Sequence, residues 1–365
     1  RPNIVVMMVD DMGFAGPSIA PYRNPHYRTS GMDRLASEGM LFTDFHASGA
    51  ICSATRAGLV TGRYQQRAGI EAVIHPHDTH PEHGKGLHAT EVTFAELFRD
   101  AGYSTGLVGK WHLGTTPTGF DYYHVLKGQG PYYNPPMLTS DGEVKHTGYT
   151  TEIITDVALN WLKEKRDPEK PFLMLYQHKA PHRNWQPGPK QLTHYDDVTI
   201  PEPATLYDDY SGRGPASKSQ TMTVANHLSE HDLKLTNQRS KLTPEQLEAW
   251  NKAYSTKNKA FREAKLEGKD LIQWKYQRYA KDYLRCIDSV DENVGRVLDY
   301  LEESGLDENT VVIYTSDQGW YLGEHGWYDK RWMYEQSFRT PCLIKWPGVT
   351  QPGTSTETMA MNLDF

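Results

Sequence analysis

The chain has 365 residues, of which 38% are hydrophobic and 23% charged, and its mean hydropathy is -0.68. A chain of this length can bury a large core, as one large domain or two modest ones. The formal net charge of -7, from 39 Lys and Arg against 46 Asp and Glu, excludes a general basic surface for nucleic acid or anionic membranes. No apolar run reaches the roughly 18 residues that a membrane span needs. The three cysteines, Cys52, Cys286 and Cys342, are too few and too far apart to indicate a disulfide framework.

Strand-like and helical patterns alternate along most of the chain. Apolar, β-branched runs predict strands buried on both faces at 3–9, 104–108, 171–176, 310–315 and 342–346. Amphipathic patterns predict helices at 31–40, 90–102, 150–166 and 271–304. This alternation predicts an α/β fold around a mostly parallel sheet.

The alternation stops between Arg183 and about Lys269. Much of this segment is rich in Pro, Gly, Asp and Tyr, which predicts a long surface excursion outside the core. Inside it, residues 243–265 predict a helix that Thr243 caps and that has Pro244 in its first turn. Because loops on a rigid scaffold carry specificity, we expect the excursion to shape a substrate rim.

Charged and polar side chains follow four of the predicted strands. Two acidic groups and two basic groups make up this set: Asp10 with Asp11, Asp317 with Gln318, Lys110 with His112, and His178 with Lys179 and His182. Ligands of open α/β sheets bind outside the carboxyl ends of the strands, so we expect these groups to converge on one pocket.

The chemistry of these side chains indicates a cation facing an oxyanion. Three carboxylates and an amide oxygen suit a hard divalent cation, and oxygen-only ligands favour Ca²⁺. Arg56, Lys110 and Lys330, with one or more histidines, would form a cationic cradle for sulfate or phosphate. Cys52 opens the run ICSATRAGLVTG at the predicted first turn of a helix, where backbone N–H groups attract anions and activate a nucleophile.

Together these motifs resemble the type I sulfatases of the alkaline phosphatase superfamily, in which the cysteine of a CxPxR signature is oxidised to formylglycine. The resemblance covers nearly all the chain outside the excursion. It is carried by NIVVMMVDDMG, TSGMDRLASEGMLFTDFHA, CSATRAGLVTGR, GKWHLG, KAPH and TSDQGWYLGEHGWYDKRWMYEQSFRTP. The last block is most similar to carbohydrate sulfatases, including those like N-acetylglucosamine-6-sulfatase and the bacterial enzymes that desulfate glycosaminoglycans or algal polysaccharides.

The resemblance implies an alkaline-phosphatase-like α/β sandwich with a large mostly parallel central sheet flanked by helices. Residues 1–365 would form the sulfatase catalytic domain, and a small C-terminal subdomain would be incomplete or missing. Two positions depart from the family pattern. Ala54 stands in place of the signature proline, and Gln318 stands where many members carry Asn or His, although its amide oxygen can still reach a cation.

The resemblance also implies a metal site and a nucleophile. One Ca²⁺ would be held by Asp10, Asp11, Asp317, Gln318 and the side chain at position 52. The hydrated aldehyde of formylglycine, derived from Cys52, would attack sulfur while the metal and Arg56 hold its hydroxyl.

The remaining catalytic roles come from the same resemblance. Lys110 and Lys330 would neutralise the sulfate oxygens in the transition state. His182 would protonate the leaving sugar oxygen, and His112 would take a proton from the second hydroxyl so that sulfate is expelled.

Three further residues are candidate substrate contacts. His178 could equally be a hydrogen-bonded core histidine or a group that supports the site from behind. His325 lies near the acidic loop and could contact sugar or serve a structural turn, and Arg331 is the third candidate. Aromatic residues beside the predicted pocket suit sugar rings, although ordinary packing accounts for most of them.

The functional hypothesis is therefore hydrolysis of sulfate monoesters of a sulfated saccharide. One alternative is a phosphodiester or phosphonate monoester hydrolase of the same superfamily, and another is a catalytically silent carbohydrate-binding protein whose Cys52 stays a thiol. The expected partners are a sulfated saccharide and a formylglycine-generating or anaerobic sulfatase-maturating enzyme, without nucleic acid. Family resemblance predicts a periplasmic or secreted protein. The chain opens on a strand-like run, so we expect that any signal peptide was removed or never present.

Overall fold

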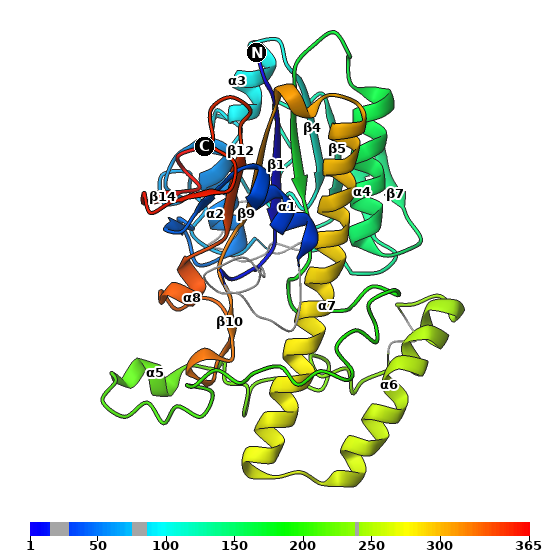
Figure 1. Cartoon of the computed structure of the whole chain (residues 1–365), viewed down its shortest axis with the longest axis vertical. Coiled ribbons are helices and arrows are strands. Elements are labelled where there is room, and N and C mark those ends of the chain that lie inside the picture. The colour runs from blue at the N-terminus through cyan, green and yellow to red at the C-terminus, as the bar shows by residue number, and fades with distance from the viewer. Residues whose placement is uncertain (15–28, 75–85, 238–240) are drawn as a thin grey trace.

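A ten-stranded sheet runs through the computed structural model, which describes residues 1–14, 29–74, 86–237 and 241–365 (Figure 1). Its strand order is β13-β2-β12-β9-β1-β8-β4-β5-β6-β7. The five central strands are all parallel: β9 (Thr310–Ser316), β1 (Asn3–Val9), β8 (Phe172–Gln177), β4 (Ser104–Gly109) and β5 (Tyr122–Leu126). The predicted α/β class with a mostly parallel central sheet is confirmed.

Antiparallel pairs occur only toward the two sides of this sheet. They involve β12 (Cys342–Lys345) with β2 (Met40–Phe42) and β9, and β6 (Pro136–Thr139) with β5 and β7 (Gly142–Lys145). The edge strand β13 (Thr354–Thr356) pairs with β2 in parallel. Small two-stranded sheets pair β10 (Tyr321–Leu322) with β11 (Tyr328–Asp329) and β14 (Ala360–Met361) with β3 (Phe45–His46).

All five predicted strands are present, with bounds within one residue of the prediction. The expected burial on both faces holds for β4 and β8 throughout. It is wrong for the end of β12, where Ile344 and Lys345 are half-buried. Lys345 reaches Glu38 at 2.8 Å and Asp307 at 3.6 Å, so this strand ends at the surface.

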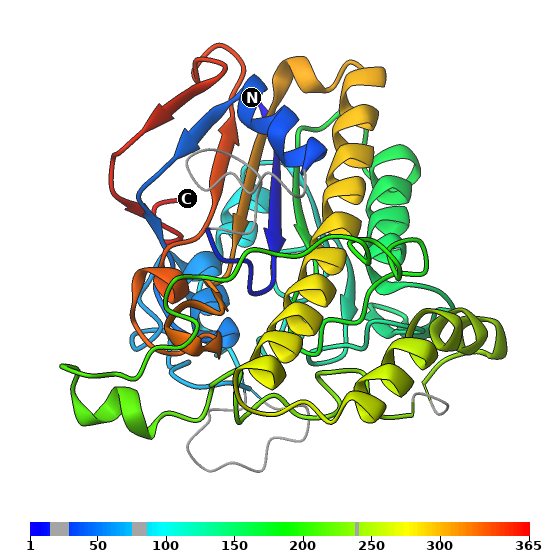
Figure 2. The same cartoon turned by 60° about the horizontal axis from the view of Figure 1, so that its bottom comes forward.

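Helices cover both faces of the sheet and bury two separate apolar clusters. The helices α1 (Ser30–Glu38), α4 (Thr150–Asn160) and α7 (Gly268–Glu303) pack together on one face, and α2 (Cys52–Thr61) and α3 (Phe94–Asp100) lie on the other (Figures 1 and 2). Successive strand residues point to opposite faces. In β1, Val5 and Met7 therefore join the cluster with α7, while Val6 joins the cluster with α2.

The predicted helices are confirmed, with shifts at their ends. The pattern at 150–166 continues beyond α4 as a π-helical turn, Trp161–Lys165. The helix predicted after Thr243 is α6 (Pro244–Ala264). Thr243 Oγ1 accepts from the Gln246 backbone N–H at 3.3 Å, and the Gln246 side chain accepts from the Thr243 backbone N–H at 2.9 Å. This reciprocal pair is a capping box.

The expectation that the segment from Arg183 to Lys269 stays outside the core is wrong. Trp185, Val224 and Trp250 are buried in the same apolar cluster as α7. The segment crosses the lower half of the molecule, and α6 forms a hairpin with α7 that extends past the sheet (Figure 1). Its short helix α5 (Pro215–Ser219) follows a long stretch of turns. Apolar residues scattered among turns have no periodicity, so the sequence pattern could not show that they cover α7. Residues 238–240 of this predicted segment lie outside the described residues.

None of the described helices is both long and apolar enough to cross a membrane.

The start of α1 is capped by a side chain from α7. The Asp291 carboxylate accepts from the backbone N–H of Gly31 at 2.9 Å and from that of Met32 at 2.8 Å. Four N–H groups at a helix start have no partner inside the helix. Asp291 satisfies two of them and thereby links α1 to α7.

We predict that Asp291→Ala lowers the free energy of unfolding by about 1–3 kcal/mol, because it leaves buried N–H groups without acceptors. Urea denaturation measures this change. The control is Asp299→Ala on the same helix, whose carboxylate is 62% exposed and pairs with Arg34; it should cost less than about 1 kcal/mol. Equal losses in both variants would contradict the capping role.

Candidate active site

The side chains predicted to converge lie together at the carboxyl edge of the sheet. Asp10 and Asp11 follow β1, and Asp317 and Gln318 follow β9. Carboxylate oxygens of Asp10, Asp11 and Asp317 lie within 4.8 Å of one another, and all three residues are fully buried. We call these three residues the acid trio. Because β1 and β9 are adjacent and parallel, their ends bring the trio together.

Each carboxylate of the acid trio bonds to a cationic side chain, and Asp10 Oδ1 also lies 4.0 Å from Arg56 Nη2. Lys110 bonds to Asp10, and Lys330 bonds to Asp11. Arg56 Nε donates to Asp317 Oδ2 at 2.9 Å. The buried cluster therefore holds three negative and three positive groups, which offsets the large cost of burying isolated charges.

Arg56 also orders the surrounding backbone. Its Nη1 donates to the Lys110 carbonyl at 2.6 Å and to Gln177 Oε1 at 2.8 Å. Gln177 ends β8, one residue beyond the predicted strand, and the sequence pattern did not single it out. The guanidinium thus joins α2, β4, β8 and β9 at the site.

In the acid trio, burial and the neighbouring charges shift the pKa of each carboxyl group. Burial by itself would raise the pKa of Asp10, but Lys110 holds it well below its ordinary value. Burial raises the pKa of Asp11 to about 7, against the opposing effect of Lys330 and with the help of the neighbouring Asp10 and Asp317 carboxylates. Burial and Asp10 also raise the pKa of Asp317. Three carboxylates this close favour additional positive charge.

Three buried oxygen atoms at the site have no hydrogen-bond partner among the described residues. They are Asp10 Oδ1, Asp11 Oδ2 and Gln318 Oε1. The amide nitrogen of Gln318 donates to Thr55 Oγ1 at 3.3 Å, so its oxygen remains available. Buried oxygens without donors, grouped with carboxylates, fit a hard divalent cation.

Cys52 is the first residue of α2 and is buried against this cluster. Its sulfur lies 3.4 Å from Lys330 Nζ, and it lies with Asp10 and His182 in a group whose ligand atoms are within 4.8 Å. The predicted helix start is confirmed. Burial raises the pKa of the Cys52 thiol despite the opposing lysines.

Two histidines reach the site from different sides. His182 Nε2 lies 3.6 Å from Asp11 Oδ2, and its Nδ1 lies 2.6 Å from the Arg183 carbonyl. His112 Nε2 lies 2.8 Å from the Ile74 carbonyl, and its Nδ1 lies 3.4 Å from Ser53 Oγ. Burial holds the pKa of both imidazoles well below the ordinary value, so both are neutral near pH 7.

The three candidate substrate contacts occupy different surroundings. His178 is buried beside Tyr176, and burial lowers its pKa to about 3. His325 Nδ1 lies 3.0 Å from Arg213 Nη1 of the excursion, and its ring packs against Trp327. The side chain of Arg331 is 51% exposed, next to Lys330 in the sequence. Of the three, Arg331 is the most accessible to a ligand.

We predict that Arg56→Met lowers the free energy of unfolding by about 3–5 kcal/mol, because it leaves the Asp317 carboxylate buried without its cation. Chemical denaturation measures the loss. Arg296→Met provides the comparison, since Arg296 pairs with Asp156 at the surface with 38% of its side chain exposed. That variant should cost no more than about 1 kcal/mol. A cost for Arg56→Met as small as for Arg296→Met would show that the buried pair is not needed for stability.

Comparisons with known proteins agree with this arrangement. A protein-family model described as Sulfatase matches residues 2–365. Among curated proteins, the N-acetylglucosamine-6-O-sulfatase of Bacteroides thetaiotaomicron is 40% identical over 100% of this chain and 66% of its own length. Human steryl-sulfatase is 27% identical, with 100% of this chain and 65% of its own length covered. The ulvan-active sulfatase of Formosa agariphila is 26% identical, with 99% and 59% covered. The chain therefore spans less than two thirds of the length of these relatives.

Solved structures give the same result for the fold. A protein described in complex with its substrate D-glucosamine-2-N,6-O-disulfate matches with a TM-score of 0.94 at 39% identity, over 100% of this chain and 75% of that one. A phosphonate monoester hydrolase of Agrobacterium radiobacter matches with a TM-score of 0.67 at 20% identity, over 100% and 72%. The second likeness concerns the fold alone.

Proposed function

The chain belongs to the sulfatase family, and from this premise we propose that it hydrolyses sulfate monoesters of a sulfated carbohydrate. The observation that carries the proposal is the buried acid trio, matched by three cations and lying against Cys52 at the start of α2. The 40% identity to an N-acetylglucosamine-6-O-sulfatase supports a 6-O-sulfated amino sugar as the substrate.

We propose one Ca²⁺ as the resident cation, held by Asp10, Asp11, Asp317, Gln318 and the side chain at position 52. When bound, it would polarise the sulfate and the nucleophile. The charges of the acid trio are already balanced by Arg56, Lys110 and Lys330, so a divalent cation would give the site two positive charges in excess. This excess suits a substrate with an anionic sulfate group.

The nucleophile in this proposal is the matured side chain of Cys52. As formylglycine it would supply a hydrated aldehyde, which can attack sulfur and later release sulfate by elimination. The raised pKa of the thiol supports a role that depends on this modification, because an unmodified Cys52 is protonated near pH 7. Arg56, anchored on Asp317, would hold the nucleophile in place.

Lys110 and Lys330 would hold the sulfate oxygens. Both ammonium groups lie inside the site, bonded to carboxylates that the cation would share. Such preorganised charges stabilise the negative charge that develops in the transition state, most strongly where water is excluded.

The two histidines would carry protons in opposite directions. His182 would protonate the leaving sugar oxygen, since the charge of a bound sulfate ester would favour its imidazolium form. A carbonyl cannot donate, so the 2.8 Å contact to Ile74 requires the proton of His112 on Nε2. His112 Nδ1 then carries a lone pair, which would accept a proton from the second hydroxyl of the nucleophile.

Three residues around the lysines that would hold the sulfate have proposed roles toward the sugar. Arg331, with its exposed guanidinium, would contact sugar hydroxyls, and His325 would contribute from the rim formed by the excursion. His178 is buried, so its contribution would be to support the site from behind. We also propose a periplasmic or secreted location, with a formylglycine-generating or anaerobic sulfatase-maturating enzyme as a partner.

Two other functions have specific support. The fold of a phosphonate monoester hydrolase is shared, although a cradle of two lysines and an arginine with one cation site favours sulfate monoesters. A silent carbohydrate-binding protein would result if Ala54 prevents maturation, because the raised pKa leaves the Cys52 thiol inert.

The first test is maturation followed by sulfate release. After coexpression with a maturation enzyme, the tryptic peptide 35–56 should lose about 18 Da, as a thiol becomes an aldehyde. The matured protein should release sulfate from N-acetylglucosamine 6-O-sulfate, stop when EDTA is added and recover with Ca²⁺. Cys52→Ser serves as the inactive control. Matured protein that cleaves phosphodiesters but releases no sulfate would overturn the proposal.

The second test concerns His182. We predict that His182→Ala lowers kcat on a sugar sulfate by about 10²–10⁴-fold, the usual contribution of general acid catalysis. The loss should be much smaller on 4-nitrophenyl sulfate, whose leaving group needs no protonation. His88→Ala, at an exposed position, controls for the loss of an imidazole elsewhere. Equal losses on the two substrates would exclude His182 as the general acid.

A further inference from the structure

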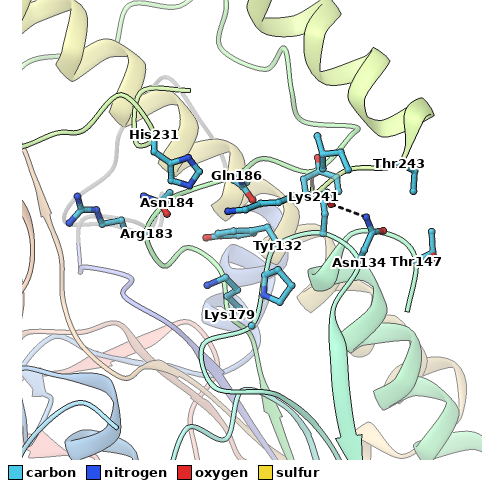
Figure 3. Close-up of a pocket in the computed structure, with 14 residues that line it drawn as sticks. Tyr132, Asn134, Thr147, Lys179, Arg183, Asn184, Gln186, His231, Lys241 and Thr243 are labelled. Carbon is cyan, nitrogen blue, oxygen red and sulfur yellow. Dashed lines mark hydrogen bonds between the residues drawn. The ribbon is translucent and has the colours of Figure 1, made fainter. Parts of the chain in front are cut away.

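A cavity of about 660 Å³ lies beside the candidate active site, where the sheet meets the excursion (Figure 3). We call it the flanking cavity. Its walls come from the loop after β5, with Tyr132, from the residues after β8, with Lys179, and from the excursion, with His231 and Lys241. The start of the 21-residue helix α6 also reaches it through Thr243, and a helix N-terminus adds partial positive charge.

The flanking cavity borders His182, the proposed general acid. In the sequence, His182 lies between Lys179 and Arg183, which both line the cavity, and the His182 carbonyl accepts from the hydroxyl of the lining residue Tyr132 at 2.5 Å. The ammonium of Lys179 is also close enough to Lys110, Asp10 and Asp11 to interact with them electrostatically. A ligand that fills the sulfate pocket could therefore extend into this cavity.

The cavity wall is cationic. The 14 lining residues include Lys179, Arg183, His231 and Lys241 but no Asp or Glu. Arg183 is neutralised by Asp232, at 2.7 Å, and points away from Tyr132 in Figure 3. The two lysines therefore carry the net charge of this wall.

Lys179 is the most informative residue of the wall. It is only 5% exposed, and its Nζ lies 5.0 Å from the centre of the Tyr132 ring. Within the part of the chain that the structure describes, it forms no salt bridge. A buried ammonium without a salt-bridge partner is costly, and the ring face and the more distant Asp10 and Asp11 carboxylates offset only part of that cost. An anionic ligand group in the cavity would supply the missing partner.

The size and the other walls of the cavity define the ligand further. Its volume exceeds that of a sulfate ion and lies within the range of small-molecule sites. Tyr132 and Tyr133 line the floor of the cavity and are buried, so its polar character comes mainly from the lysines, with Asn134 and Gln186 at its edge. These features indicate a saccharide unit that carries a negative charge.

We propose that the flanking cavity is a second subsite, which binds an anionic sugar unit next to the unit that carries the scissile sulfate. The anionic group is a carboxylate or a second sulfate. This inference rests on the proposed function, because it extends the same substrate. Lys179 and Lys241 bind the anionic group, and the substrate is an acidic oligosaccharide.

Binding tests the subsite independently of catalysis. The probes are two disaccharides without sulfate esters, glucuronic acid linked to N-acetylglucosamine and its neutral counterpart with glucose. Titration calorimetry uses the full chain with Cys52 as a thiol, so nothing is turned over. We expect about tenfold tighter binding of the acidic probe, as for one charged hydrogen bond. A third probe, the neutral disaccharide with a sulfate on its glucose unit, shows which of the two anions is preferred.

Substitutions of the two cavity lysines test whether they cause the tighter binding of the acidic probe. Lys179→Met and Lys241→Met should each remove most of it, and Lys241 is exposed, so its replacement does not threaten folding. Lys165→Met is the matched control, because Lys165 Nζ also lies 5.0 Å from a tyrosine ring, that of Tyr122, outside the cavity. Equal affinity for all three probes, or a preference that survives both cavity variants, overturns the subsite.

Turnover separates this inference from the proposed function. With matured protein, the ratio of kcat/KM between acidic and neutral 6-O-sulfated disaccharides should fall about tenfold in Lys179→Met. This ratio is insensitive to a general loss of activity. Sulfate release without any preference between the two overturns the subsite and leaves the proposed function standing. A lack of release from both disaccharides overturns the proposed function, and the binding preference then decides the subsite alone.

Discussion

The buried charge balance at the carboxyl edge of the sheet is the constraint on which the rest of the site depends. Three carboxylates without solvent contact are stable only beside equal positive charge, and Arg56, Lys110 and Lys330 supply it from three separate segments. Two of these groups, Lys110 and Lys330, are the ones that we propose hold the sulfate, and Arg56 would hold the nucleophile. The cations that the fold needs to stabilise its buried carboxylates are therefore also the groups proposed to act on the substrate.

The excursion packs against α7 beside this edge of the sheet. Its apolar side chains share one buried cluster with those of α7, and its polar loops line the flanking cavity. The long helix also carries Asp291, which caps α1 on the same face of the sheet. One helix thus connects the core, the helical layer and the rim where an extended substrate would lie.

The positions of most site residues could be predicted because each follows a predicted strand. Parallel strands bring their carboxyl ends to one edge, so Asp10 and Asp317 were expected at the same edge of the sheet. That they are neighbours follows from the pairing of β1 with β9 in the structure. Gln177 also follows a predicted strand, but its role depends on Arg56, which lies far away in the sequence. Asp291 lies inside α7, and its partners Gly31 and Met32 are equally distant in the sequence, so strand ends could not indicate it. The burial of Trp185 and Val224 was missed for a similar reason, since no periodicity marks an apolar residue within a turn-rich segment.

The sequence by itself determined the fold class, the strands, the first turn of α2 and the residue types that meet at the sheet edge, because local periodicity and chain order encode them. Only the tertiary structure decided which cation faces which carboxylate, that burial raises the pKa of Cys52, and that Lys179 lies in a cavity without a carboxylate partner among the described residues. These properties depend on desolvation and on distances between segments, and both exist only after the chain has packed.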